Sequence, residues 1–233
     1  GGEIKLKEII LDENILTRSE EVDLVKEAKL VKEIVSELKH VIKHTDGMVS
    51  LSAPQIGYYK RIFVVKYGDN FRTYINPMLT EATGFCMSRE TCHSNPNKKY
   101  IIPRCTKIKV AYMIPEDSEN YTEEELAGMS AIVIQHQINH LDSVPLDCLG
   151  LEIDEDFENA SDEEQDEIIN MFIKSLQKRQ DNLIEEINKD KELKKAMTAI
   201  DNVINTVKGE KGTTGKVIPI KNGKRSKDSN KEK

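Results

Sequence analysis

Two histidines in the middle of the chain, His136 and His140, have a spacing that could bind a metal ion. Residues four apart lie on one face of an α-helix, so both imidazoles could contact the same ion. In metal hydrolases built this way, a glutamate that transfers protons usually follows the first histidine. Gln137 stands at that position here. The spacing therefore leaves three possibilities: a hydrolase, a hydrolase without its base, or a structural pair of histidines.

A second pair with the same spacing, His40 and His44, shows that spacing alone is weak evidence. That pair ends a charged amphipathic segment, where a protonated imidazole would complement the helix dipole. His136 and His140 differ because the apolar stretch 131–134 precedes them, which indicates a buried helix. Buried imidazoles need polar partners, and a shared metal ion would serve both.

Cys92 is the candidate for a third ligand. A thiolate and two imidazoles suit Zn²⁺ or Fe²⁺ and leave a fourth position for water. His93 cannot easily join Cys92 at the same ion, because adjacent side chains of an extended chain point to opposite faces. The alternative for Cys92 is an ordinary buried thiol. None of the four cysteines has CxxC spacing, which favours reduced thiols and a cytoplasmic protein.

The elements that must position these residues follow from the hydrophobic pattern, which predicts an α+β fold. We expect small antiparallel sheets around the histidine-bearing helix, followed by an extended C-terminal helix. An irregular loop is expected over 84–104 and an acidic connector over 154–167. The expected helices cover 20–45, 123–142 and 166–207, with an interruption near 188–192 in the last, and the expected strands cover 61–66, 71–79 and 106–114.

Charge is unevenly distributed along the chain, although the net charge is only −7. Residues 208–233 carry nine basic and three acidic side chains, a balance of +6, which leaves −13 for the rest. The acidic body is therefore not expected to bind nucleic acid by charge, whereas the tail could contact a ribosome or another acidic assembly. The tail is expected to be disordered. No apolar run is long enough to predict a membrane span.

Three segments, in order, resemble the signature motifs of the peptide deformylase family. The family patterns are GxGLAAPQ, EGCLS and QHExDHLDG. The corresponding segments here are MVSLSAPQIG (48–57), ETCHS (90–94) and QHQINHLDS (135–143). The resemblance implies a deformylase-like domain over 1–175, with a helical extension over 176–207 and a basic tail over 208–233.

The resemblance also implies a function for each motif. It makes Cys92, His136 and His140 the ligands of a divalent metal, with Fe²⁺ expected and Zn²⁺ or Ni²⁺ as alternatives. The metal would activate water against the formyl group of N-formylmethionyl peptides, and Gln55 and the backbone N–H of His93 would stabilise the oxyanion. Substrate would be lined by the motif and helix residues Val49, Ser50, Leu51, Glu90, Thr91, Ile132 and Val133.

The chain departs from the family patterns inside the expected site. Gln137 replaces the glutamate that would act as the base, and a carboxamide cannot accept or pass on a proton at neutral pH. The further departures are Met48, Ser50, Thr91, His93 and Asn139. Together they favour natural divergence over one introduced substitution.

Three functions remain open at this point. The first is a deformylase-type hydrolase with activity impaired or lost at Gln137. The second is a metal-bearing protein that binds formylated or modified peptide N-termini without turnover. The third is a scaffold whose C-terminal helix and basic tail dock on an assembly.

Overall fold

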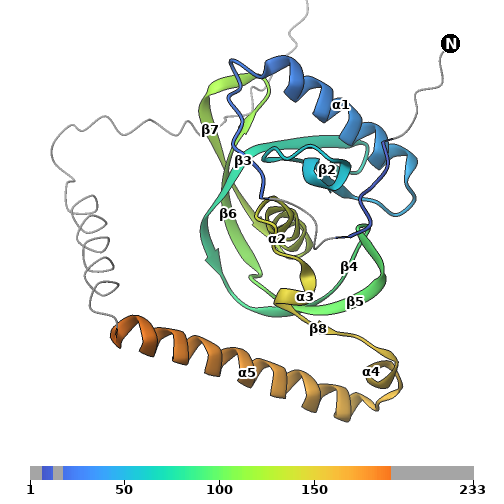
Figure 1. Ribbon diagram of the computed structural model, residues 1–233, viewed down its shortest axis with the longest axis vertical. Coiled ribbons are helices and arrows are strands. Elements are labelled where there is room, and N and C mark those ends of the chain that lie inside the picture. Colours follow the sequence, from blue (N-terminus) through green and yellow to red (C-terminus); the bar gives the residue numbers. More distant parts are fainter. Residues whose placement is uncertain (1–6, 13–17, 190–233) are drawn as a thin grey trace, which may run out of the picture. The chain divides into compact units, whose positions relative to one another are not determined.

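The computed structural model describes residues 7–12 and 18–189, which fall into two compact units (Figure 1). The first unit's described residues end at Asp154, and the second begins at Glu155. The domain boundary predicted at residue 175 lies inside α5 (Asp162–Lys189), the last helix of the described residues. The helices of the first unit are α1 (Ala28–His44), the 3₁₀ helix η2 (Ala53–Ile56), α2 (Met129–Leu141) and α3 (Leu146–Leu149).

The first unit contains two antiparallel sheets, which confirms the predicted α+β class. One sheet has the strand order β1-β2-β3-β6-β7 and the other β4-β5-β8, and α2 lies between them (Figure 1). The strands are β1 (Ser50–Ser52), β2 (Ile62–Tyr67), β3 (Asn70–Thr83), β4 (Cys86–Cys92), β5 (Asn95–Arg104), β6 (Lys107–Ile114), β7 (Asp117–Ala127) and β8 (Leu151–Glu152).

Strand β2 separates two hydrophobic cores. Successive side chains of a strand point to opposite faces, and the first four of β2 are all buried. Ile62 and Val64 pack in the core that α1 covers, whereas Phe63 and Val65 pack in the core that contains α2. The histidine-bearing helix is therefore held against a sheet that is itself covered on its other face.

The segment 84–104, predicted as an irregular loop, is instead the β4–β5 hairpin. The pairing runs from Cys86 opposite Arg104 to Cys92 opposite Asn95. The buried side chains of β4 are Ser88, Glu90 and Cys92, of which only the cysteine is common in protein cores. Because polar groups face inward, the alternation that identifies a strand was hidden.

The helix predicted over 123–142 begins only at Met129, and its first part is wrong. Residues 123–127 belong to β7 and pair with β6, despite a composition of Glu, Leu and Ala that favours helix. Gly128 separates the two elements with φ 59° and ψ −135°, a conformation open almost only to glycine. Tertiary pairing thus outweighs local propensity here.

The first predicted helix, 20–45, also begins later, at Ala28. The Asp23 carboxylate accepts hydrogen bonds from the backbone of Val25 and Lys26, which holds a turn ahead of the helix. The backbone of Glu20 forms an isolated parallel β-bridge with Lys60 instead of joining the helix.

The second unit contains α4 (Glu155–Asn159) and α5. The acidic connector predicted over 154–167 is therefore largely helical. Predictions for residues 190–233, including the end of the extended helix and the basic tail, lie outside the described residues. No helix in the described part of the chain has the length and apolar character needed to cross a membrane.

Candidate metal centre

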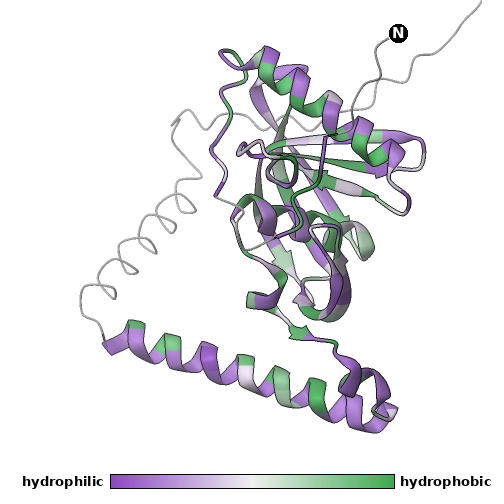
Figure 2. Ribbon diagram, turned by 45° about the vertical axis from the view of Figure 1, so that its right-hand side comes forward, coloured by the Kyte–Doolittle hydropathy of each residue, from purple (hydrophilic) through white to green (hydrophobic). Residues whose placement is uncertain are grey.

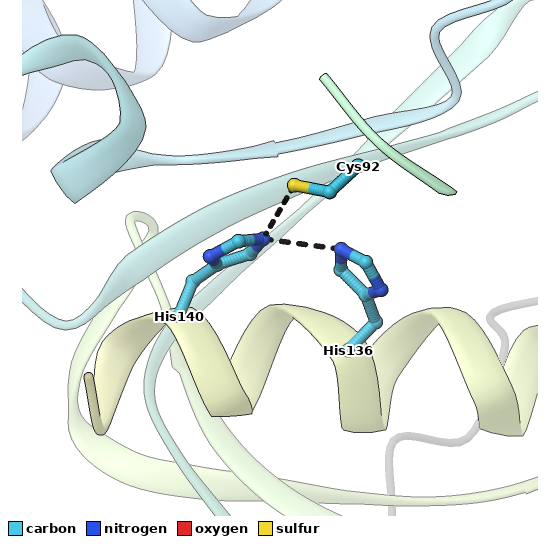
Figure 3. Close-up of side chains that lie close together, drawn as sticks. All are labelled: Cys92, His136 and His140. Atoms are coloured by element: carbon cyan, nitrogen blue, oxygen red, sulfur yellow. Dashed lines mark hydrogen bonds between the residues drawn. The ribbon is translucent and has the colours of Figure 1, made fainter. Parts of the chain in front are cut away.

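Cys92, His136 and His140 converge at one point between the β4–β5 hairpin and α2 (Figure 3). The Cys92 Sγ lies 3.3 Å from Nε2 of His140, which lies 3.1 Å from Nε2 of His136. The three potential ligand atoms all lie within 4.8 Å of one another. Residues far apart in the sequence thus present one sulfur and two nitrogens to the same small volume.

Helix α2 fixes both histidines on the face toward the hairpin (Figure 3). Ala131, Ile134, Ile138 and Leu141 anchor the helix in the core beneath β2. His140 is almost fully buried, and this burial, assisted by His136 and Arg104, lowers its pKa well below the ordinary value. The ring is therefore neutral, the form whose nitrogen lone pair binds a metal.

Glu90 fixes the orientation of His136. Its Oε2 accepts a 2.8 Å hydrogen bond from Nδ1 of His136, which leaves Nε2 directed at His140 and Cys92. Arg104 binds the same carboxylate through Nε and Nη2, at 2.7 and 2.8 Å. Burial opposes ionisation of Glu90, but the hydrogen bonds from Arg104 and His136 prevail and lower its pKa to about 2. The histidine therefore has an anionic acceptor behind it.

Arg104 and its contacts were not identified from the sequence. Its Nη1 donates a 2.5 Å hydrogen bond to Oδ1 of Asn139, so the guanidinium joins the hairpin to α2. Arg104 is buried, and a buried arginine needs acidic or carbonyl partners. Glu90 in the ETCHS segment was the only available clue, because it is an acidic residue next to predicted ligands.

Gln55 lies in η2, close to Cys92. Its Oε1 accepts hydrogen bonds from the backbone N–H and the hydroxyl of Ser52, at 3.0 and 3.1 Å. Its Nε2 is thereby directed at Ser94 Oγ, 3.1 Å away, and at Cys92 Sγ, 3.7 Å away. The side chain is held as a donor beside the three ligand candidates, as its predicted role requires.

Gln137 makes one polar contact in the cavity. Its Nε2 donates a 2.8 Å hydrogen bond to Oγ of Ser50 on β1. Its Oε1 is buried and has no hydrogen-bond partner. Two of the departures from the family patterns, Ser50 and Gln137, are therefore in contact with each other.

A cavity of about 210 Å³ opens beside these groups. Of the predicted lining residues, all but Leu51 line it: Val49, Ser50, Glu90, Thr91, Ile132 and Val133. Leu51 is wholly buried in the core under α1, because it follows Ser50 on β1 and points to the opposite face. His93 also lines the cavity, and partial burial together with nearby His136 lowers its pKa. The sequence did not indicate four other lining residues, Gly47, Ser88, Arg89 and Met129.

The second histidine pair lies in a different environment. His44 contacts the backbone carbonyl of His40 through Nδ1, 2.8 Å away. This contact ties His44 to its own helix, as the structural interpretation of that pair requires. Among the described residues, only Cys92, His136 and His140 form a cluster that could hold a metal ion.

The donor set of the main cluster fits a divalent transition metal. One thiolate and two neutral imidazoles suit Zn²⁺ or Fe²⁺, and three protein ligands leave a position for a reacting molecule. The carboxylate behind His136 is the outer contact that such sites use to fix a ligand's tautomer.

Comparison with known proteins agrees with this geometry. The family model described as "Polypeptide deformylase" matches residues 8–148, more than half of the chain. The chain belongs to the polypeptide deformylase family. This is a family of metal-dependent hydrolases, and the expected family membership is confirmed.

The similar proteins include bacterial and phage deformylases. The peptide deformylase of Dictyoglomus thermophilum is 33% identical over 134 residues, which cover 57% of this chain and 84% of that protein. The crystal structure of the Thermotoga maritima enzyme superimposes with a TM-score of 0.55 at 31% identity, covering 62% of this chain and 95% of the other. A probable deformylase from Synechococcus phage S-SSM7 gives 0.54 at 28% identity, covering 61% and 97%.

Proposed function

We propose that this chain is a metal-dependent amide hydrolase that acts on N-formylmethionyl peptides, with turnover reduced by Gln137. The observation that carries the proposal is the convergence of Cys92, His136 and His140 beside the fixed amide of Gln55. A divalent ion held by the three ligands would supply a Lewis acid that activates water and polarises a carbonyl. Fe²⁺ is the ion we expect, with Zn²⁺ or Ni²⁺ as alternatives.

The protein groups around the ligands divide the remaining work. The NH₂ group of Gln55 and the backbone N–H of His93 would donate to the oxygen of the formyl group as negative charge develops there. Apolar side chains of Val49, Ile132 and Val133 give the cavity a wall that suits the flexible thioether of methionine.

Gln137 limits the proton transfers. Hydrolysis of the formyl amide needs a group that removes a proton from water and delivers one to the leaving amine. A carboxamide does neither, and losing a general base costs about 10²–10⁴-fold in rate. Ser50 accepts a hydrogen bond from Gln137, so the amide is held in place instead of rotating to other contacts.

A second function, binding of formylated N-termini without turnover, is favoured by the other end of the Gln137 amide. Gln137 Oε1 is a buried acceptor without a partner, and a bound peptide amide could satisfy it. Under either function the substrates are newly made chains, so we propose a cytoplasmic protein that works in N-terminal processing. Contact of residues 208–233 with a ribosome or another assembly is part of this proposal.

Formate release from a formyl-Met-Ala-Ser peptide separates the two functions. We expect anaerobically Fe²⁺-loaded protein to release formate slowly, and chelator-treated protein to give none. Saturable peptide binding without formate release would instead support the binding function. If the protein neither binds the peptide nor releases formate, both functions are contradicted.

A further inference from the structure

Helix α5 has an apolar stripe that no other described residue of its own unit buries. None of its residues is buried, and hydrophobic residues recur along it between hydrophilic ones (Figure 2). Ile169, Phe172, Ile173 and Leu176 are half-exposed at three- and four-residue steps, and Met171 is 71% exposed. A stripe with this period is the surface by which one helix packs on another.

The stripe follows the spacing of a two-stranded coiled coil. Residues at alternating steps of three and four form the seam, labelled a and d in the heptad notation. In the first part of α5 the a positions are Asp162, Ile169 and Leu176, and the d positions are Gln165, Phe172 and Arg179. Apolar side chains fill the centre of this seam, and opposite charges stand at its two ends.

Charge determines which partner and which direction the seam accepts. Residues 162–167 carry five acidic side chains, whereas 174–179 carry three basic ones. A second copy running parallel would place acidic residues against acidic ones and basic against basic. A second copy running antiparallel brings the acidic segment of each helix to the basic segment of the other.

In one antiparallel register, the twofold axis of the helix pair passes between Asn170 and Met171. Ile169 then faces Phe172 of the second copy. Towards each end, Gln165 faces Leu176, and Asp162 faces Arg179. Each layer joins an a position of one helix to a d position of the other. The hydrophobic layers thus lie at the centre and an oppositely charged pair closes each end.

A second antiparallel register would bring more apolar residues of the two helices together, but it is disfavoured by charge. An antiparallel pair centred on Leu176 would place Ile169 opposite Leu183. It would also bring Glu167 against Glu185, and Lys174 against Lys178. Like charges across an interface are destabilising, so the sequence discriminates against this alternative.

We propose that α5 is a homodimerisation element, with residues 162–179 of two copies pairing as an antiparallel coiled coil. This inference does not depend on the proposed function, because it uses no residue of the metal centre. The paired stretch is short, so the dimer should dissociate on dilution instead of being permanent.

Charge reversal at the two ends of the seam tests the proposal. In a dimer of the Asp162→Arg variant, the introduced arginine faces Arg179 of the second copy. In a dimer of the Arg179→Glu variant, the introduced glutamate faces Asp162 of the second copy. Each single variant therefore forms two repulsive layers. Mixing the two variants restores Arg opposite Glu in one layer and Arg opposite Asp in the other. Sedimentation velocity of the full-length proteins over a range of concentrations reads out the dimer.

We expect each single variant to raise the dimer dissociation constant by about tenfold or more, which is ~1.4 kcal/mol. The equimolar mixture and the doubly reversed protein should return to within about threefold of the original value. Asp181→Arg and Lys189→Glu, which reverse charges outside the paired stretch, are the matched controls and should change nothing. Far-UV circular dichroism checks that the helix persists in each variant.

Three outcomes would overturn the proposal. They are a monomer at all concentrations, a dimer indifferent to the single reversals, and single variants that stay monomeric when mixed. Packing of α5 on its own chain would give the first result. A dimer through another surface would give the second.

Discussion

At the scale of residues, the candidate site combines three convergent metal-ligand candidates with a glutamine where the family pattern has glutamate. Glu90 and Arg104 hold His136, and Ser52 holds Gln55, so hydrogen bonds already fix the orientation of both side chains. Gln137 is equally fixed, but by Ser50, a hydroxyl where the family pattern has glycine. Because Ser50 and Gln137 are in contact, we expect the effects of substituting them to be coupled.

The first prediction concerns the carboxylate behind His136. In Glu90→Gln the anionic acceptor is lost, so His136 becomes a weaker and less oriented ligand. We expect metal affinity to fall by about 10–100-fold. Competition with a chromophoric chelator measures this affinity, and Glu119→Gln, an exposed change on β7, is the control. Equal affinities in the two variants would show that Glu90 does not support the site.

At the scale of elements, Gly128 determines where β7 ends and α2 begins. Its φ is positive, and a side-chain carbon added at this position would have no neighbour within 4 Å, so the restriction is conformational, not steric crowding. We expect Gly128→Ala to lower the free energy of unfolding by about 1–3 kcal/mol. Thermal unfolding followed by circular dichroism measures the change. An unaltered melting temperature would mean that the connection relaxes without cost.

The elements also show what a sequence can and cannot reveal. The fold class and the ligand helix were predictable, because α2 buries an apolar face and carries its histidines at helical spacing. The β4–β5 hairpin was missed since Ser88, Glu90 and Cys92 are polar or reactive side chains that face inward. The buried charge of Glu90 is compensated by Arg104 on the neighbouring strand and by His136 on α2, contacts that no local pattern encodes.

The site residues were predicted unevenly for the same reason. Cys92, His136 and His140 were identifiable from motif and spacing, and the structure brings them together. Leu51 was assigned to the cavity because it lies in a motif, yet strand geometry turns it into the core. Arg104 could not be predicted, because it supports the site through a contact with Glu90 that only the folded chain creates.

At the scale of the whole molecule, metal binding should be linked to stability. The ligands come from β4 and α2, so a bound ion would join two elements that are distant in sequence. At a free metal concentration of about 100 times the dissociation constant, binding stabilises the folded state by about 2.7 kcal/mol. We expect chelation to lower the melting temperature of the metal-loaded protein, and to have no effect on Cys92→Ser. Equal shifts in both proteins would contradict binding at this site.

We propose above that Gln137 limits turnover at the deformylase-type site. The most direct test compares formate release by the protein as it stands with that of Gln137→Glu and Ser50→Gly/Gln137→Glu, all Fe²⁺-loaded and saturated with formyl-Met-Ala-Ser. Gln177→Glu, the same chemical change on α5, is the control. We expect the glutamate to raise turnover by about 10²–10⁴-fold, and most when glycine replaces Ser50. Turnover unchanged by the glutamate in both backgrounds, with metal bound, would show that Gln137 does not limit the reaction.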